Sequence, residues 1–366
     1  MKLSTTRESL LKPLQAVIGV VERRQTMPIL GNVLITAKKG TVTVAATDLE
    51  VELVASADMD GVTVPGEITV PGRKLMDIVR ALAESAPVSL ALEGDRFVVK
   101  SGRSRFVLAT LPSAEFPLVD KVEASSRLKL RQADVQHLLT KTQFSMAQND
   151  VRYYLNGLML ETGKKYVRAV ATDGHRLAMC EISIEKQEVT SGQVIVPRKG
   201  VMELARLMGD GEEIQLDIGS NHVRATLNGI RLTSKLIDGR FPDYERVIPA
   251  GKGATLTASR AVLRQALQRV GILSNERYRG VRLEVAKNAL VIQANNPDQE
   301  EAREELEVQY DGESMEIGFN VTYLLDAIDA IDTDDVQIDL VDSNSSCLIH
   351  PSKPSGAQYV VMPMRL

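Results

Sequence analysis

Four consecutive residues near the middle of the chain, Asp173-Gly174-His175-Arg176, are of the types used in general acid–base catalysis. The chain has only four histidines, and a nearby aspartate could orient this one as a general base. The competing interpretation is a turn, because glycine tolerates positive φ and an aspartate side chain accepts hydrogen bonds from the backbone that follows it. We favour the turn, since it is the commoner use of such a stretch.

The composition is that of an ordinary globular protein with more than one domain. The chain has 366 residues, of which 44% are hydrophobic and 25% charged, and it shows neither a signal sequence nor a membrane-spanning stretch. We therefore expect a cytoplasmic protein with no membrane association. Cys180 and Cys347 have no partners at metal-ligand spacing, so we expect no metal and no cofactor. The net charge of −4 argues against nucleic-acid binding unless basic residues gather locally.

One pattern occurs three times along the chain. Each copy has two strands of alternating hydropathy joined by a short turn, followed by a step in which Ala-Thr-Asp or a related triplet ends the second strand. The copies lie at 27–53, 151–179 and 276–302. The step contains Asp48 in the first copy, Asp173 in the second and Asn296 in the third. A turn shared by all three copies is thus a better account of Asp173 than catalysis.

Two amphipathic helices accompany each hairpin. The first precedes it, at 7–20, 131–147 and 259–273, and the second ends a strand–helix segment at 68–82, 194–208 and 315–331. The period of about 120 to 130 residues is the size of a whole domain. We predict an α+β protein of three similar domains, each with two helices on antiparallel sheets, at 1–122, 123–250 and 251–366.

Five of the six helices have a basic face. Examples are Arg260 and Arg264 on one helix, Arg131 and Lys141 on another and Arg206 on a third. Rows of Lys and Arg without interleaved aromatic residues suit phosphate contacts that ignore base sequence. The sixth helix has Asp326, Asp329 and Asp332 and does not fit this pattern.

Oppositely charged runs occur in the first and third repeats. The basic run is 95–106 and the acidic run is 296–307, and apolar residues lie near each. Such complementarity suits a head-to-tail contact between two copies of the chain. The predicted interface residues are Lys74, Arg96, Arg103, Arg105, Phe106, Leu108, Ile272, Leu273, Asp298, Glu300, Glu301 and Glu304.

The whole chain resembles the bacterial β sliding clamps, the processivity subunits of DNA polymerase III. The resemblance is carried by many uninterrupted motifs in order. They include MPILGN (27–32), SGRSRF (101–106), ATDGHRLA (171–178), VPRKG (196–200), DGRFPDY (238–244), ANNPDQEEA (294–302) and the ending YVVMPMRL (359–366).

This resemblance implies a non-catalytic protein whose domains form a ring as a head-to-tail homodimer around duplex DNA. A ring held by topology needs only weak phosphate contacts in order to slide. The positions that match DNA contacts of the family, or that stand on the basic helix faces, are Arg24, Arg73, Gln148, Asn149, Tyr153, Tyr154 and Lys199.

The resemblance also implies a groove for short linear peptides. The expected partners are the α subunit of DNA polymerase III, the δ subunit of the clamp loader, other DNA polymerases and repair proteins. The matching positions are Leu155, Thr172, Gly174, His175, Arg176, Leu177, Pro242, Arg246, Val247, Tyr278, Asn320, Tyr323, Asn344, Ser346, Val360, Met362, Pro363, Met364 and Arg365. In this interpretation His175 is a contact residue.

Two alternatives compete with the clamp. A hydrolase would use Asp173 and His175, but the chain has no phosphate-binding loop, no nucleophile elbow and no clustered carboxylates. A monomeric peptide-binding scaffold without DNA is disfavoured by the basic helix faces.

Overall fold

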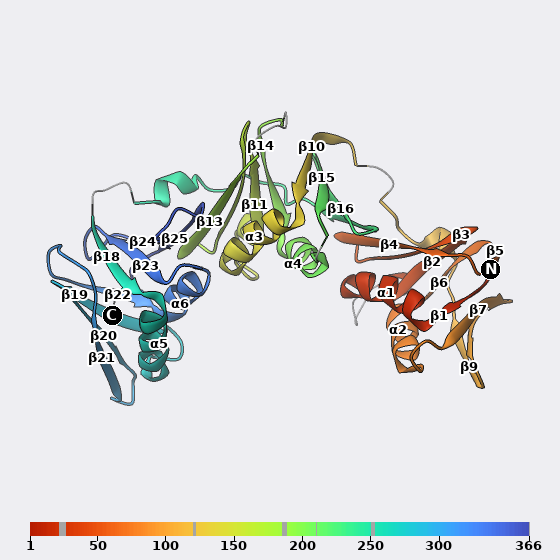
Figure 1. Cartoon of the computed structure of the whole chain (residues 1–366), viewed down its shortest axis with the longest axis horizontal. Helices are drawn as coiled ribbons and strands as arrows, with labels where there is room; N and C mark the ends of the chain where they lie inside the picture. The colour runs from red at the N-terminus through yellow and green to blue at the C-terminus, as the bar shows by residue number, and fades with distance from the viewer. Residues whose placement is uncertain (22–26, 120–121, 185–188, 210, 250–252, 366) are drawn as a thin grey trace. The chain divides into compact units, whose positions relative to one another are not determined.

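The computed structural model describes residues 1–21, 27–119, 122–184, 189–209, 211–249 and 253–365. All six predicted helices are present (Figure 1). They are α1 (Arg7–Val17), α2 (Gly72–Ala81), α3 (Gln132–Thr142), α4 (Arg198–Leu207), α5 (Arg260–Val270) and α6 (Val321–Asp329). The first helix of each repeat continues into a 3-10 turn, namely η1 (Ile18–Val20), η4 (Gln143–Ser145) and η7 (Gly271–Leu273).

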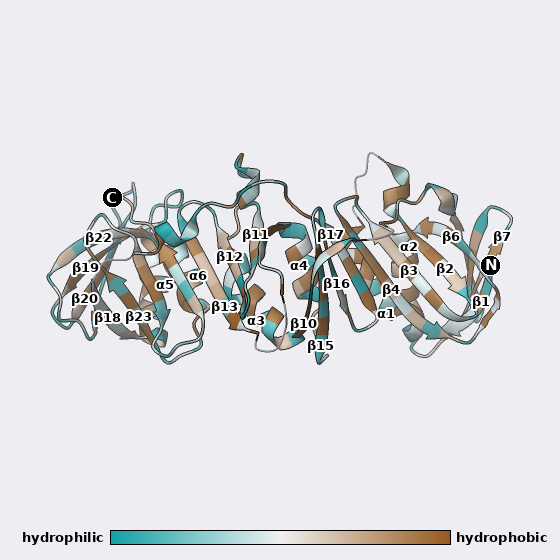
Figure 2. Cartoon of the chain, turned by 90° about the horizontal axis from the view of Figure 1, so that it is seen from above, coloured by the Kyte–Doolittle hydropathy of each residue, from teal (hydrophilic) through white to brown (hydrophobic). Residues whose placement is uncertain are grey.

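The apolar stripe of each helix is buried largely as its periodicity predicts. On α5, Leu263, Ala266, Leu267 and Val270 are buried. Val262 on the same helix is 50% exposed, because it lies at the margin of the arc that meets the sheets. Hydrophobic and hydrophilic residues likewise follow each other along many strands (Figure 2).

The chain forms two compact units, each with a five- or four-stranded sheet and an eight-stranded sheet, and all strand pairs are antiparallel. The first unit comprises 1–135 and 199–236. Its five-stranded sheet has the order β5 (Val62–Val64), β1 (Lys2–Thr6), β7 (Pro87–Glu93), β8 (Arg96–Ser101), β9 (Ser104–Ala109). Its eight-stranded sheet has the order β10 (Ala124–Arg131), β15 (Glu213–Gly219), β16 (His222–Leu227), β17 (Ile230–Lys235), β4 (Val51–Met59), β3 (Gly40–Thr47), β2 (Asn32–Lys38), β6 (Gly66–Pro71).

The second unit comprises 136–198 and 237–366. Its eight-stranded sheet has the order β14 (Gly192–Pro197), β11 (Gly157–Thr162), β12 (Tyr166–Thr172), β13 (Arg176–Ser183), β25 (Ala357–Val361), β24 (Cys347–Pro351), β23 (Asp335–Leu340), β18 (Ala254–Ser259). Its four-stranded sheet has the order β21 (Glu301–Glu307), β20 (Ala289–Asn295), β19 (Gly280–Ala286), β22 (Met315–Asn320). Each unit therefore contains one terminal repeat and half of the middle repeat, because the middle repeat divides its strands between the two eight-stranded sheets.

The Asp or Asn step forms the same turn in all three repeats, as the sequence predicts. In each copy the side-chain Oδ1 accepts two hydrogen bonds from backbone N–H groups further along. These run to Asp48 from Glu50 (2.9 Å) and Val51 (2.7 Å), to Asp173 from His175 (2.9 Å) and Arg176 (3.1 Å), and to Asn296 from Asp298 (3.1 Å) and Glu300 (3.0 Å). The step is therefore a structural turn in which a side-chain oxygen, instead of a backbone carbonyl, accepts hydrogen bonds from backbone N–H groups.

Candidate functional site

The catalytic interpretation of the Asp173 turn is wrong. The two oxygens of the Asp173 carboxylate accept bonds from the backbone of His175 and Arg176 and from Nε of Arg176, the last at 3.1 Å. No hydrogen bond joins the His175 ring to Asp173 among the described residues, so the general-base pair is not formed. Within the described ranges there is also no cluster of three His, Cys, Asp or Glu side chains that could hold a metal.

The turn instead lies at the edge of an apolar groove in the second unit. The groove has a cavity volume of about 160 Å³. Nine of the residues that line it were predicted as groove residues from the family resemblance, namely Leu155, Thr172, Gly174, Arg176, Leu177, Pro242, Val247, Val360 and Met362. The largely apolar lining suits hydrophobic side chains of a ligand rather than a reacting polar group.

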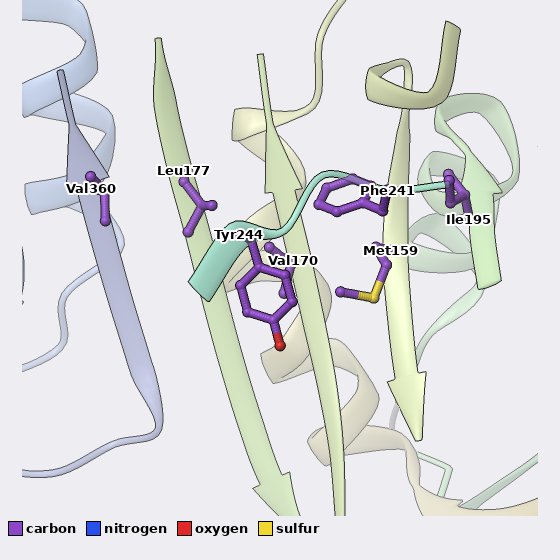
Figure 3. Close-up of a cluster of buried hydrophobic side chains, with 7 residues drawn as sticks. All are labelled: Met159, Val170, Leu177, Ile195, Phe241, Tyr244 and Val360. Carbon is purple, nitrogen blue, oxygen red and sulfur yellow. The ribbon is translucent and has the colours of Figure 1, made fainter. Parts of the chain in front are cut away.

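A buried cluster forms the floor of this groove. Leu177 on β13 and Val360 on β25 are paired in register and lie beside Val170 and Met159 on the neighbouring strands (Figure 3). The segment 237–248 crosses the same sheet face and packs Phe241 and Tyr244 on it, as Figure 3 shows. These side chains come from strands and from a connecting segment far apart in the sequence, and the fold of the second unit brings them together.

Arg168 on β12 holds the crossing segment in place. Its guanidinium donates to the Tyr244 hydroxyl and forms ion pairs with Glu181 (2.6 Å) and Glu161 (3.4 Å). The Tyr244 hydroxyl in turn donates to Glu161 at 2.6 Å. Burial and this bond to Glu161 raise the pKa of Tyr244 above its ordinary value, so the phenol remains a donor. A mostly buried charged network thus positions one wall of an apolar groove.

Arg176 ties the other wall to the last helix. Its guanidinium forms an ion pair with Asp326 of α6 and donates to the Phe144 carbonyl at 2.8 Å. It also lies 4.5 Å from the centre of the Tyr323 ring. The side chain is only 12% exposed, so it contributes its aliphatic stem to the groove while its charge is neutralised behind it.

The acidic face of α6 is explained by neighbouring cations. Asp326 pairs with Arg176, and Asp329 pairs with Arg264 of α5. Asp332, just beyond the helix, pairs with Lys141 at 2.6 Å. The aspartates that broke the basic pattern are therefore internal counterions of the second unit.

The remaining predicted groove residues lie outside the cavity lining. The amide Nδ2 of Asn320 donates to the Tyr278 carbonyl at 3.2 Å, and Asn320 caps α6. Tyr323 stacks with Arg176, while Arg246 pairs with Asp243. His175 and Arg365 are exposed, Asn344 is exposed in a turn, and Ser346, Pro363 and Met364 are partly buried.

Three lining residues were missed as groove residues: Arg152, Tyr154 and Tyr244. Tyr154 was expected at DNA, yet it is half-buried against the floor cluster. Tyr244 stood inside a motif that the sequence singled out, DGRFPDY. The sequence did offer a sign that Tyr244 belongs to a packed site. It is an aromatic residue in a polar connecting segment, and such a residue packs on an apolar surface.

The DNA candidates divide between the two units. Arg73 on α2 is exposed and donates to the Val21 carbonyl at 2.5 Å, and Lys199 on α4 forms an ion pair with Asp48. In the second unit, Gln148, Asn149 and Tyr153 are exposed. Arg24 lies outside the described residues.

Several cations of the predicted basic faces contact the C-terminal ends of helices. Arg7 donates to the carbonyls of Val79 and Arg80 at the end of α2, and Arg206 donates to those of Gln15 and Ala16 at the end of α1. The expectation that Lys141 is exposed is wrong, because it is buried and donates to the Ala330 carbonyl beyond α6 at 2.6 Å. A cation at a helix C-terminus satisfies free carbonyls and complements the helix dipole.

The predicted dimer residues lie on edge strands and their surroundings. The strand β9 ends the five-stranded sheet of the first unit, and β21 ends the four-stranded sheet of the second. Arg105 pairs with Glu93 (3.2 Å) and Glu304 with Arg269 (2.5 Å). Of the predicted dimer residues, Lys74 on α2 is exposed, as are Arg96, Arg103, Asp298, Glu300, Glu301 and Ile272, whereas Phe106 and Leu273 are partly buried and Leu108 is buried.

Both cysteines are buried, and their titration gives a pH prediction. Burial raises the pKa of Cys180 and of Cys347 to about 12. A thiol in the unfolded chain ionises near pH ~8.5. Above that pH the unfolded chain loses protons that the folded chain keeps, so the free energy of unfolding falls by about 1.4 kcal/mol per pH unit for each thiol.

We therefore expect the folded protein to react slowly with a disulfide reagent at neutral pH and rapidly once denatured. Denaturation of the Cys180→Ala/Cys347→Ala variant between neutral and strongly alkaline pH should show a shallower loss of stability than the parent. Equal slopes for parent and variant would contradict the raised pKa values.

The class defined by the fold and the site is a multidomain scaffold, with three repeated α+β domains and an apolar groove. Family models of the DNA polymerase III β subunit match its N-terminal domain at 1–120, its central domain at 129–243 and its C-terminal domain at 245–365. The β sliding clamps of Pseudomonas putida KT2440 and Escherichia coli K12 are each 51% identical over the full length of both chains. The crystal structure of the Pseudomonas aeruginosa DNA polymerase III β subunit superimposes with a TM-score of 0.97 at 50% identity, again over both full chains.

The chain belongs to the β sliding clamp family, the β subunits of DNA polymerase III. It is a DNA sliding clamp, a non-catalytic processivity subunit, with three clamp domains built of helices on antiparallel sheets. No helix in the described part of the chain is long and apolar enough to cross a membrane.

Proposed function

We propose that two copies of this chain close head to tail into a ring around duplex DNA, in the cytoplasm. The ring tethers the α subunit of DNA polymerase III, the δ subunit of the clamp loader, and other polymerases and repair proteins through short linear peptides. Each copy contributes three domains, with the proposed limits 1–122, 123–250 and 251–366. The observation that supports the proposed tethering is the apolar groove beside the Asp173 turn.

The ring is supported by two complementary sheet edges. Along β9 and β21 one side of the strand has no partner among the described residues, which leaves its backbone groups open to pairing. Arg103 beside β9 and Glu301 on β21 form no ion pair within the described part of the chain. Opposite charges at the two edges favour pairing of β9 with β21, and like charges disfavour pairing of either edge with a second copy of itself.

Contact with DNA is proposed for Arg24, Arg73, Gln148, Asn149, Tyr153, Tyr154 and Lys199. Arg73, on a predicted basic face, is exposed, and so are Gln148, Asn149 and Tyr153. Weak, sequence-independent phosphate contact is what a mobile ring requires.

We propose that the groove residues predicted from the family resemblance, together with Tyr244, bind the peptides. The floor is rigid, because Leu177 and Val360 sit on paired strands. One rim is adaptable, because Met362 has a long unbranched side chain and is 38% exposed. A fixed floor with a flexible methionine rim suits several different peptides.

Retention on DNA of different topology tests the ring. We expect the protein, once loaded by a clamp loader, to stay on closed circular DNA and to leave within the same period when a restriction enzyme linearises that DNA. Equal retention on both forms would mean that binding is by contact rather than by encirclement.

A further inference from the structure

A second hollow adjoins the groove on the same sheet of the second unit. It has a cavity volume of about 660 Å³, against about 160 Å³ for the groove. We call it the polar hollow and define it by Met179, Glu181, Asp339, Leu348, His350 and Gln358, which line it together with the loop 351–356. The groove alone is smaller than an ordinary ligand site of about 300 Å³ or more.

Strand register places the two hollows side by side on one face of the sheet. Leu177 pairs with Val360 at the groove, and two residues along each strand Met179 pairs with Gln358 in the polar hollow. Residues two apart on a strand lie on the same face. Leu348 on β24 pairs with Val360 and packs against the floor cluster of the groove. One sheet face therefore changes from apolar to polar along its strands.

The two hollows also share a wall. Arg168 lines the polar hollow, and the Tyr244 ring to which it donates lines the groove. The Arg168–Tyr244 contact therefore lies where the groove borders the polar hollow.

The charges of the polar hollow are compensated except at its rim. Arg168 pairs with Glu181 at 2.6 Å, and the His350 ring lies 3.2 Å from Asp339. Lys353 in the rim loop is exposed and forms no ion pair with any described residue. The side-chain amides of Gln337 and Gln358 form no hydrogen bonds within the described part of the chain, so they can bond to an extended backbone.

We propose that the polar hollow binds the flank of the same peptide whose apolar residues occupy the groove, and that it favours an extended flank with an acidic residue opposite Lys353. This inference rests on the proposed peptide function of the groove. From Leu177 to Glu181 the strand rises about 13 Å, so a flank of about four residues reaches the polar hollow.

The test starts from a peptide selected on the full-length protein from a random pentapeptide library, kept only if Leu177→Asp abolishes its binding. This pentapeptide is extended at either end by Ser-Asp-Ser-Asp or by Ser-Lys-Ser-Lys, and the Kd of each is measured. When the acidic flank is attached at one of the two ends, it should lower the Kd about fivefold relative to the pentapeptide alone. This is within the range of an exposed charge pair plus backbone hydrogen bonds.

Three variants locate the effect. Lys353→Glu should remove the gain from the acidic flank and favour the lysine flank, and Gln358→Ala should lower the gain about twofold. The matched control is Lys287→Glu, the same charge change at an exposed turn of the same unit, which should leave all affinities unchanged.

Failure of this inference and failure of the groove proposal look different. If the pentapeptide binds but neither flank adds affinity, or if the gain survives Lys353→Glu and Gln358→Ala, the polar hollow is not the flank site while the groove stands. If no selected peptide depends on Leu177, the groove proposal falls and this inference falls with it.

Discussion

Replacing Arg168 with alanine is expected to lower peptide affinity at the groove more than tenfold, although Arg168 does not line that groove. Without the guanidinium, the Tyr244 hydroxyl loses a partner and two mostly buried carboxylates, Glu161 and Glu181, lose their counterion. Removing one member of a buried ion pair costs about 3–5 kcal/mol, and the 17% exposure of Arg168 places this case near about 3 kcal/mol. The segment that carries Tyr244 and Pro242 should then leave the sheet face.

Two measurements separate positioning from general loss of stability. Peptide Kd is compared with the denaturation midpoint for Arg168→Ala and for Tyr244→Phe, which keeps the ring but not the hydroxyl. Tyr244→Phe should weaken peptide binding a few-fold with a cost of only about 1 kcal/mol in stability. A matched control is Arg127→Ala, whose exposed side chain pairs loosely with Asp217 at 3.7 Å. Normal peptide affinity in a folded Arg168→Ala protein would contradict the positioning role.

Local features of this chain could be predicted from sequence because they depend on neighbouring residues. The turn at Asp48, Asp173 and Asn296 uses bonds between residues two to four apart, so three copies of one short pattern were enough to predict it. The six helices follow from apolar periodicity in the same way.

Partner choice across the fold could not be predicted in this way. The periodicity of α3 gives no indication that Lys141 reaches a carbonyl 189 residues later, and that of α6 does not say which cation meets Asp326. The same limit hid Tyr244, whose partner Arg168 lies 76 residues earlier on a strand. Charge alone marks a residue as polar, whereas only the fold decides whether it meets solvent, a helix end or a counterion.

The resemblance to β sliding clamps supplied groove positions that no local pattern would give. Leu177, Val360 and Pro242 are ordinary core or loop residues when each is considered alone. They form a site because β13 and β25 pair across two repeats and the segment 237–248 returns over both. The family resemblance identifies positions that the packing brings together, but it does not show which contacts hold them there. For this reason it did not identify Tyr244 or the charged network behind it.

Replacing Ile272 and Leu273 together with alanine is expected to convert the proposed dimer into monomers. Ile272 is 74% exposed at the end of α5, an unusual place for a large apolar side chain unless another surface covers it. Apolar anchors inside a charged rim contribute most of an interface's energy, often about 2 kcal/mol or more each. Losing two should weaken dimerisation by at least about 100-fold, and sedimentation velocity measures the change.

The control is Val262→Ala, which removes a half-exposed apolar side chain from the same helix and should leave the dimer intact. Because a monomer cannot encircle DNA, the Ile272→Ala/Leu273→Ala protein should also lose retention on closed circular DNA. It should still bind peptides at the groove, since all the residues that line the groove lie within one copy of the chain. An undisturbed dimer in sedimentation would remove both residues from the interface, whereas monomers that remain on circular DNA would separate dimerisation from retention and contradict the ring.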